Sequence, residues 1–321
     1  MKGRFAPSPT GRMHLGNVFC ALLSWLSSRS RGGVWLLRIE DLDPQRSRPE
    51  YAALIEDDLR WLGLDWDEGG STGGSCGPYF QSLRSAVYEE YLQRLWHSGR
   101  VYPCRCTRAN IMATQAPHES DGRIVYAGTC RPAHLRTGSD LMAFTCPDGP
   151  IPEHVKLRLL VPDQTVTFSD MHYGTQSVNL ASHCGDFLLR RADGAWAYQL
   201  AVVVDDALMG VSEVVRGRDL LLSTPQQIWL ARLLGFGVPD HCHHPLLVNE
   251  SGQRLSKRDS SLDMGVLRQH FLPEQIVGWL AFLCGLTDVP EPVSARDLIP
   301  VFDWNKVPEH DICVRKDILS F

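Results

Sequence analysis

One stretch near the start of the chain decides the fold, and it reads Gly3-Arg4-Phe5-Ala6-Pro7-Ser8-Pro9-Thr10-Gly11-Arg12-Met13-His14-Leu15-Gly16-Asn17. The run 3–6 predicts a short strand, and apolar residues at helical spacing from Leu15 onward predict a helix. Two glycines and the apolar run 34–39 then predict a second strand. A strand, helix, strand unit is typical of an α/β protein with a parallel sheet.

Cap residues, prolines and glycines indicate where further helices begin and end. The expected helices are one opened by Ser47 and Pro49, one from Ser82 to Gly99, one from Thr224 to Leu234 with Gly235 behind it, and one over 273–285.

The character of the sequence changes between residues 100 and 191. Glycine, proline and cysteine accumulate there, and the runs 156–161 and 165–168 alternate like antiparallel strands. We expect an insertion that ends in a hairpin turn at Asp193-Gly194. The run 198–209 fits a strand or a buried helix equally well. The expected division is a nucleotide-binding core in two halves, 1–99 and 192–240, an insertion, 100–191, and a segment, 241–321, with a loop and helices.

Composition excludes several classes of protein. With 44% hydrophobic and 21% charged residues, the 321-residue chain is neither disordered nor fibrous. No apolar run approaches the roughly 20 residues of a membrane span, and no secretion signal opens the chain, so we expect a cytoplasmic protein. Its ten cysteines are then thiols or metal ligands. The net charge of -5 means that any RNA binding needs a local basic patch.

The segment from Pro7 to Asn17 lies where a strand ends and a helix begins. Backbone donors and the helix dipole attract phosphate at such a place in α/β sheets. Gly16 would let an adenine approach the backbone, and His14 could donate to phosphate oxygens. The alternative is a proline-rich turn with a capping histidine.

A second segment, Arg254-Leu255-Ser256-Lys257-Arg258, surrounds a serine with cations just after a turn that contains glycine. A mobile loop of this kind could bring Lys257 onto a triphosphate. The alternative is a solvated basic turn, which is more common.

These two segments, in this order, resemble the HIGH and KMSKS signatures of class I aminoacyl-tRNA synthetases. Asn17 and Leu255 are mild variants of those signatures. The segments that resemble the glutamyl-tRNA synthetase catalytic core are 4–11, 38–41, 198–206 and 214–221. The resemblance spans most of the chain from Gly3 to Arg258. It implies a Rossmann-type α/β fold with an inserted zinc-containing subdomain and a short helical C-terminal segment.

The resemblance also implies roles for individual residues, with His14 and Lys257 as catalytic groups. Glutamate would be bound by Arg4, Phe5, Ala6, Pro7, Ser8, Glu40, Tyr198 and Arg216, and ATP by His14, Gly16, Asn17, Leu255, Ser256 and Lys257. The chemistry agrees, because guanidinium groups suit carboxylates and a carboxylate suits an ammonium. As alternatives, Arg4 could pair with Asp41 in the core, and Tyr198 could simply pack.

Three cysteines of the insertion are candidate metal ligands. By spacing alone, Cys104, Cys106 and Cys130 are a weak signal, and buried thiols are an equal alternative. The resemblance implies one structural zinc on these thiolates and Tyr126, as in the short relatives called glutamyl-queuosine tRNA(Asp) synthetases. The run His241-Cys242-His243-His244 is expected to be a surface loop without a metal, because adjacent side chains rarely converge on one ion.

The chain ends too soon after Arg258 to hold the anticodon-reading region of full glutamyl-tRNA synthetases. The resemblance therefore implies the short branch of the family. Such an enzyme activates L-glutamate with ATP, with Mg²⁺ expected, and transfers it to the cyclopentenediol of queuosine at the wobble position of tRNA(Asp). The alternatives are a truncated glutamyl-tRNA synthetase that charges a 3′ end and an inactive zinc-containing paralogue that binds RNA. We expect a monomer without membrane contact.

Overall fold

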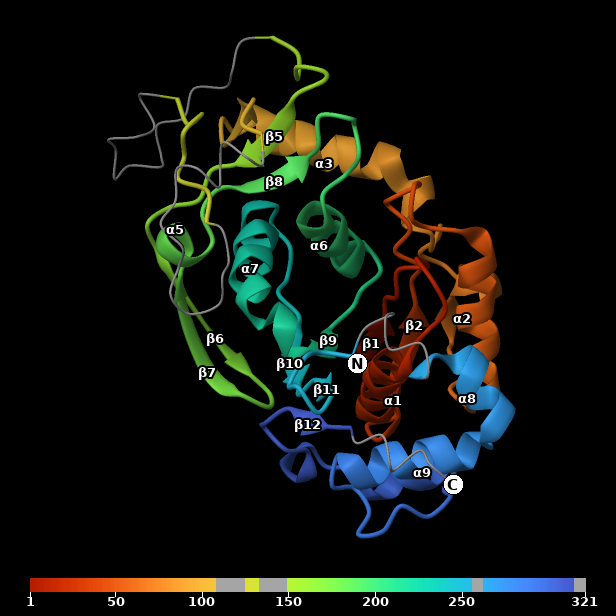
Figure 1. Ribbon diagram of the computed structural model, residues 1–321. Coiled ribbons are helices and arrows are strands. Elements are labelled where there is room, and N and C mark those ends of the chain that lie inside the picture. The colour runs from red at the N-terminus through yellow and green to blue at the C-terminus, as the bar shows by residue number, and fades with distance from the viewer. Residues whose placement is uncertain (108–124, 133–148, 256–261, 315–321) are drawn as a thin grey trace.

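Helices and strands alternate along the first hundred residues, as the sequence predicts. The structure is a computed structural model that describes residues 1–107, 125–132, 149–255 and 262–314 (Figure 1). Its helices are α1 (Leu15–Arg29), α2 (Pro49–Trp61), α3 (Ser85–His97), α5 (Leu180–His183), α6 (Tyr198–Leu208), α7 (Thr224–Leu233), α8 (Met264–His270) and α9 (Pro273–Leu283). Its strands are β1 (Lys2–Phe5), β2 (Val34–Leu37), β3 (Glu68–Gly69), β4 (Val101–Cys104), β5 (Lys156–Leu159), β6 (Thr165–Asp170), β7 (Gly174–Asn179), β8 (Phe187–Arg190), β9 (Glu213–Gly217), β10 (Asp240–His244), β11 (Leu247–Val248) and β12 (Ile312–Cys313).

The core is built on parallel strands, which confirms the predicted α/β class. Strand β1 pairs in parallel with β2 and β2 with β3, while β10 pairs in parallel with β9 and β6. Strands β1 and β9 lie side by side, and just before β9 the backbone N–H of Ser212 donates to the Lys2 carbonyl at 2.9 Å. The chain leaves β1 towards β2 and leaves β9 towards β10, so the strand order reverses between β1 and β9. Open α/β sheets bind ligands at such a reversal.

Alternate side chains of the sheet enter different cores, as the two-residue period of a strand requires. Trp35 and Leu37 pack in the core that contains α1, while Leu36 between them packs on the other face. In β9, Val215 joins the α1 core and Val214 the opposite one. Both faces are therefore covered. None of the helices in the described ranges is long and apolar enough to span a bilayer.

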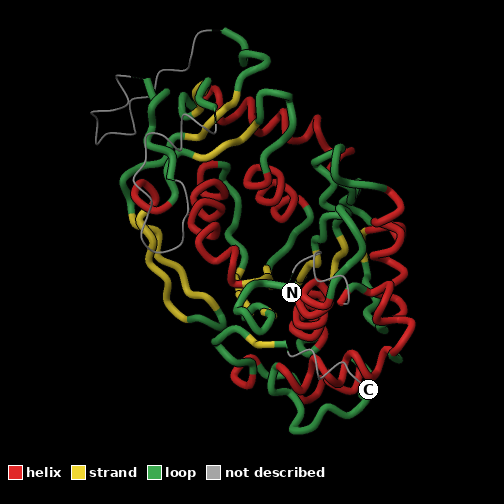
Figure 2. The backbone as a smooth tube through the Cα atoms, in the orientation of Figure 1, coloured by secondary structure: helices red, strands yellow, loops and turns green. Residues whose placement is uncertain are grey.

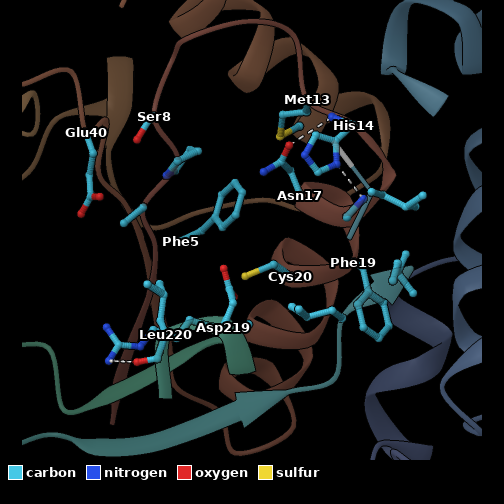
Figure 3. Close-up of a pocket in the computed structure, with 18 of the residues that line it drawn as sticks. Phe5, Ser8, Met13, His14, Asn17, Phe19, Cys20, Glu40, Asp219 and Leu220 are labelled. Carbon is cyan, nitrogen blue, oxygen red and sulfur yellow. Dashed lines mark hydrogen bonds between the residues drawn. The ribbon is translucent and has the colours of Figure 1, made fainter. Parts of the chain in front are cut away.

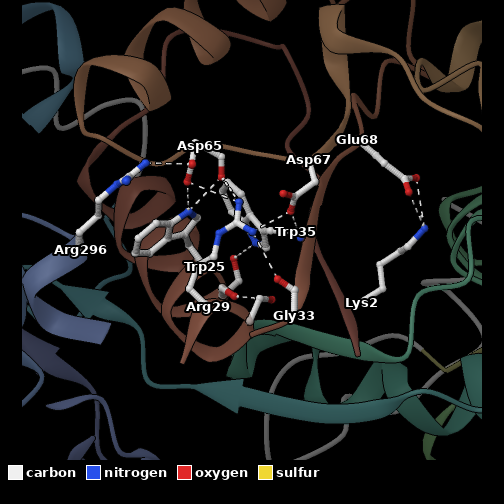
Figure 4. Close-up of polar contacts among 11 residues, drawn as sticks. Lys2, Trp25, Arg29, Gly33, Trp35, Asp65, Asp67, Glu68 and Arg296 are labelled. Carbon is white, nitrogen blue, oxygen red and sulfur yellow. Dashed lines mark hydrogen bonds and ion pairs between the residues drawn. The ribbon is translucent and has the colours of Figure 1, made fainter. Parts of the chain in front are cut away.

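Polar contacts fix the C-terminal half of α1 to the segment that leads into β3 (Figure 4). The Trp25 indole donates to the Asp65 carbonyl at 2.9 Å, and Arg29 pairs with Asp67 at 2.7 Å. The Asp67 carboxylate also accepts from the backbone N–H of Trp35 in β2 at 2.7 Å. These bonds set the position of α1 along the sheet, and so the position of its N-terminus.

Residues 100–191 contain antiparallel strands, as predicted. Strands β4, β5 and β8 form one sheet, while the hairpin of β6 and β7 joins the central strands through β10 (Figure 2). The predicted turn at Asp193-Gly194 is present, with a φ of 86° at Gly194 and a hydrogen bond of 2.8 Å from Arg191 N to the Ala195 carbonyl. The ambiguous run that follows is the helix α6.

Three predicted caps are wrong, although the helices they marked are present. The hydroxyl of Ser82 donates to Asp41 at 2.6 Å, and α3 begins after an intervening 3-10 turn. Thr224 lies inside α7, where its hydroxyl accepts from Arg216 at 2.7 Å. Arg48, and not Ser47, precedes α2. The hydroxyls of Ser82 and Thr224 bond to residues that are distant in the sequence, and local spacing cannot predict such contacts. The predicted ends near Gly99, Gly235 and Gly285 are confirmed, each with positive φ.

Candidate active site

A cavity of about 430 Å³ lies at the reversal of strand order, a volume typical of small-molecule sites. It is lined by residues that follow β1, residues at the end of β9 and the first turn of α1. Most of the predicted site residues line it: Arg4, Phe5, Ala6, Pro7, Ser8, His14, Gly16, Asn17, Glu40, Tyr198, Arg216 and Leu255. Ser256 and Lys257 lie outside the described residues. Figure 3 shows Glu40 at one end of the cavity and His14 with Asn17 at the other.

His14 is the N-cap of α1 and also part of the cavity wall. Its Nδ1 accepts from the Gly16 backbone at 3.1 Å, and Asn17 Oδ1 accepts from the His14 backbone at 3.1 Å. A Cβ on Gly16 would lie 2.9 Å from His14 Cε1, so the imidazole itself requires a glycine there. The positive end of the α1 dipole faces the cavity, where it favours an anion.

A buried network of charges lies under the Glu40 end. Arg38 is 0% exposed and pairs with Asp206 at 2.7 Å, with Glu40 at 3.2 Å and with Asp205 at 3.8 Å. Arg4 lies 3.5 Å from Asp206 and donates to the Val215 carbonyl at 3.3 Å. Arg4 therefore does not pair with Asp41, whose carboxylate accepts from Ser82 instead. Arg4 and Glu40 thus share one network and one cavity.

The carboxylates of this network differ in pKa. Burial raises the pKa of Glu40, although Arg38 and Arg4 act against this. Burial also disfavours ionisation of Asp206, but there the same two arginines prevail and lower the pKa. Asp206 therefore balances the arginines, and Glu40 is the carboxylate whose ionised form gains most from a cationic ligand.

Arg216 and Tyr198 form another part of the wall. The guanidinium Nη1 donates to the Tyr198 hydroxyl at 3.5 Å, and Nε donates to His243 Nε2 at 3.0 Å. Burial lowers the pKa of Arg216 and raises that of Tyr198. The guanidinium groups of Arg4 and Arg216 and the carboxylate of Glu40 thus line the same cavity, which suits a ligand that carries carboxylates and an ammonium.

The structure adds lining residues that sequence reasoning missed: Phe19, Cys20, Asp219 and His244. Burial raises the pKa of Cys20 to about 11, so this thiol stays neutral. Asp219 forms an ion pair with Arg254 of the basic segment. Asp219 lies in the segment 214–221 that resembles the synthetase core, so the sequence could have indicated it as a site residue.

The expectation of a surface loop over 241–244 is wrong. These residues form the buried strand β10, in the middle of its sheet. Hydrogen bonds satisfy polar atoms of two of these histidines: His243 Nδ1 lies 2.6 Å from Asp170, and His244 Nδ1 lies 2.8 Å from the Pro245 carbonyl. The sequence could have indicated a strand here, because residues 241–244 follow α7 and Gly235, and in an α/β core a strand normally follows a helix.

The three cysteines predicted as metal ligands converge. The Sγ atoms of Cys104, Cys106 and Cys130 lie within 4.8 Å of one another. The Tyr126 hydroxyl lies 3.5 Å from Cys104 Sγ and 3.7 Å from Cys106 Sγ. Burial opposes ionisation of Cys130, but hydrogen bonds from Tyr126 and the Arg105 backbone lower its pKa to about 7. All cysteines of the described ranges are free thiols. This cluster can hold one metal ion.

Comparisons with known proteins agree with this geometry. Residues 1–320 match the family described as tRNA synthetases class I (E and Q), catalytic domain. A relative named glutamyl-Q tRNA(Asp) synthetase from Symbiobacterium thermophilum is 48% identical over 99% of this chain and 97% of its own length. One of the same name from Nitratidesulfovibrio vulgaris is 46% identical over 100% of this chain and 97% of its own.

Among solved structures, a glutamate tRNA ligase from Elizabethkingia meningosepticum, in complex with its amino acid, matches with a TM-score of 0.78 and 29% identity. The match covers 98% of this chain and 66% of that one. The Rossmann-type sheet, the cavity at its reversal and these similarities lead to one conclusion. The chain belongs to the class I tRNA synthetases of the E and Q group, and it is a ligase.

Proposed function

We propose that this chain activates L-glutamate with ATP and transfers it to the cyclopentenediol of queuosine at the wobble position of tRNA(Asp). The observation that carries the proposal is the convergence of Arg4, Arg216 and Glu40 on one cavity that begins at the N-terminus of α1. The names of the two relatives support the acceptor.

The charges of the cavity support glutamate as the amino acid. Its two carboxylates are matched by Arg4 and Arg216, and its ammonium by Glu40, with Ser8 and Tyr198 as further hydrogen-bonding groups. Phe5, Ala6 and Pro7 supply backbone and apolar surface. Glutamine would leave a buried guanidinium opposite a neutral amide, and polar mismatches of this kind discriminate strongly.

The opposite end of the cavity supports ATP as the second substrate. Gly16 and Asn17 form the first turn of α1 with Leu255 nearby, and His14 donates to phosphate oxygens as their charge grows. The resemblance assigns Ser256 and Lys257, which lie outside the described residues, to the phosphates, with Mg²⁺ as a further countercharge. The glutamate α-carboxylate attacks the α-phosphorus and pyrophosphate leaves. A diol hydroxyl then attacks the mixed-anhydride carbonyl and gives up its proton to solvent, the bond between the carbonyl carbon and the phosphate oxygen breaks, and AMP leaves.

The cysteine cluster fits one structural zinc. Neighbouring ligand atoms around a tetrahedral zinc lie about 3.8 Å apart when Zn–S bonds are near 2.3 Å, and Cys106 and Cys130 Sγ are 3.4 Å apart. Cys104, Cys106, Tyr126 and Cys130 would occupy all four positions, so the ion stabilises the inserted subdomain (100–191) only. Residues 1–99 and 192–240 form the catalytic core of this proposal, and 241–321 carry the basic segment and the C-terminal helices.

The decisive experiment locates the transferred glutamate. The protein is incubated with ATP, labelled glutamate and tRNA(Asp) that contains or lacks queuosine, and the RNA is digested to nucleosides. We expect label on the queuosine nucleoside alone, and pyrophosphate exchange that needs glutamate but no tRNA. Label on the 3′ adenosine would instead indicate a truncated glutamyl-tRNA synthetase. No exchange at all would indicate an RNA-binding paralogue. Lys257→Ala should slow exchange through kcat.

A further inference from the structure

A buried carboxylate and imidazole lie directly behind the Arg216 guanidinium. Asp170 ends β6, His243 is in β10 and Arg216 is in β9, so the three belong to neighbouring strands of one sheet (Figure 1). His243 Nδ1 lies 2.6 Å from Asp170 Oδ2, and Arg216 Nε lies 3.0 Å from His243 Nε2. Asp170 and His243 do not line the cavity. Among the hydrogen bonds of the described residues, their side chains reach the cavity wall through Arg216, and His243 Nε2 also lies 3.2 Å from the hydroxyl of Thr224, which itself accepts from Arg216.

The hydrogen bonds determine which nitrogen of His243 carries the proton. An arginine N–H can only donate, so His243 Nε2 must accept from Arg216. Nδ1 then carries the proton and donates to Asp170, the arrangement in which one ring partner sets the tautomer for the other. Burial lowers the pKa of His243 to about 4, and the charge of Arg216 acts in the same direction, so the ring is neutral.

Asp170 is itself anchored by the backbone. Its Oδ1 accepts from the backbone N–H groups of His172 at 3.1 Å, Tyr173 at 2.9 Å and His243 at 3.3 Å. Burial opposes its ionisation, yet the hydrogen bond from His243 prevails and lowers its pKa. An ionised carboxylate with one oxygen held by three N–H groups has its other oxygen aimed at the imidazole.

Most donors of Arg216 are already engaged within the described part of the chain. Nε donates to His243, Nη2 to the Thr224 hydroxyl at 2.7 Å and the Leu220 carbonyl at 3.5 Å, and one Nη1 proton to Tyr198. These contacts leave the outer side of Nη1 for a ligand. The direction in which Nη1 points therefore depends on the groups that hold the other two nitrogens.

We propose that Asp170 and His243 are positioning residues that orient Arg216 towards the side-chain carboxylate of the amino-acid substrate and thereby set the affinity for it. The proposal rests on the proposed function, because it takes glutamate as the ligand of Arg216. It assigns the pair no contact with substrate and no proton transfer. Its effect is confined to one substrate, since the ATP end of the cavity is at the N-terminus of α1.

The test is Asp170→Asn, which keeps the shape and removes the charge. Three backbone N–H groups still require the amide oxygen, so the amide NH₂ must face His243 Nδ1. The imidazole then carries its proton on Nε2, where it opposes the N–H of Arg216, as a carboxylate-to-amide change reverses the tautomer in serine proteases. Glutamate-dependent pyrophosphate exchange should show a glutamate KM raised about tenfold or more, with the ATP KM unchanged.

A pair of variants at the imidazole separates positioning from packing. His243→Gln offers an amide oxygen that can accept from Arg216, and His243→Leu offers none, so the glutamate KM should rise more for leucine. Asp186→Asn is the matched control, because Asp186 is buried, bonded to Tyr102 and Arg131, and absent from the cavity wall. It should leave both KM values unchanged.

Three outcomes overturn the inference while leaving the function intact: an unchanged glutamate KM in Asp170→Asn, an equal rise in both KM values, or equal effects of glutamine and leucine at 243. If the Asn variant does not fold, the comparison at 243 decides alone. Absence of glutamate-dependent exchange in the unmodified protein would overturn the proposed function itself, so the two failures are distinguishable.

Discussion

Gly16→Ala tests whether the imidazole of His14 is held in place for the nucleotide. The new Cβ would lie 2.9 Å from His14 Cε1, closer than two carbon atoms tolerate, and 3.1 Å from Nδ1, which is also tight. The ring must therefore turn. Turning it breaks the hydrogen bond of 3.1 Å from the Gly16 backbone to Nδ1, and it moves His14 within the wall of the cavity.

The effects on stability nearly cancel. Loss of an N-cap bond costs about 0.5–2 kcal/mol, whereas replacing glycine by alanine within a helix gains up to about 1 kcal/mol. We therefore expect the free energy of unfolding to change by less than about 1 kcal/mol. A hydrogen bond to a charged phosphate is worth about 1.5–3 kcal/mol, so kcat/KM for ATP should fall about tenfold or more.

The assay is pyrophosphate exchange at varied ATP, together with urea unfolding of the same preparations. Gly237→Ala is the control, because a Cβ there meets nothing within 4 Å and its φ is not positive. An unchanged kcat/KM for ATP in Gly16→Ala, with the control also unchanged, would refute the placement of His14 at the phosphates. A loss of several kcal/mol in stability would refute the cancellation.

Three further predictions follow from buried charge and from the cysteine cluster. Arg38→Met leaves buried carboxylates without their cation and should destabilise the fold by about 3–5 kcal/mol, measured as a lower urea midpoint at constant slope. Burial raises the pKa of Glu40, so kcat/KM for glutamate should fall on acidification at a pH higher than the pKa of an ordinary carboxyl group. Glu40→Gln should not show this fall in its pH profile. Metal analysis of Cys104→Ser with Cys130→Ser should find the zinc lost, while exchange without tRNA persists because neither residue lines the cavity; full retention of zinc would contradict the assignment.

Local signals predicted most of the helices and the parallel core. The glycines after α3, α7 and α9 stop those helices because they adopt positive φ, which is a property of the residue itself. Caps were less predictable, since Ser82 bonds to Asp41, and Thr224 accepts from Arg216. A hydroxyl bonds to whatever tertiary contact lies nearest, and spacing along the chain carries no information about that.

The two candidate arginines illustrate the same division for the site. Arg4 and Arg216 were identifiable from their motifs, and the chemistry of a guanidinium already indicated a carboxylate ligand. Their partners were not identifiable, because they come from other elements and meet the arginines only after the sheet has formed. Asp206 pairs with Arg4, and His243, which is held by Asp170, accepts from Arg216.

The sequence by itself determined the alternation of strands and helices, the turn that opens α1 and the set of residue types available to a nucleotide and an amino acid. These follow from period, propensity and side-chain chemistry, which are local. Only the tertiary structure decided that 198–208 is a helix, that 241–244 is a buried strand, and that Asp170 and His243 lie behind Arg216. An apolar or histidine-rich run fits more than one type of secondary structure. Its tertiary surroundings decide between them, because a polar group buried without a hydrogen-bond partner costs free energy.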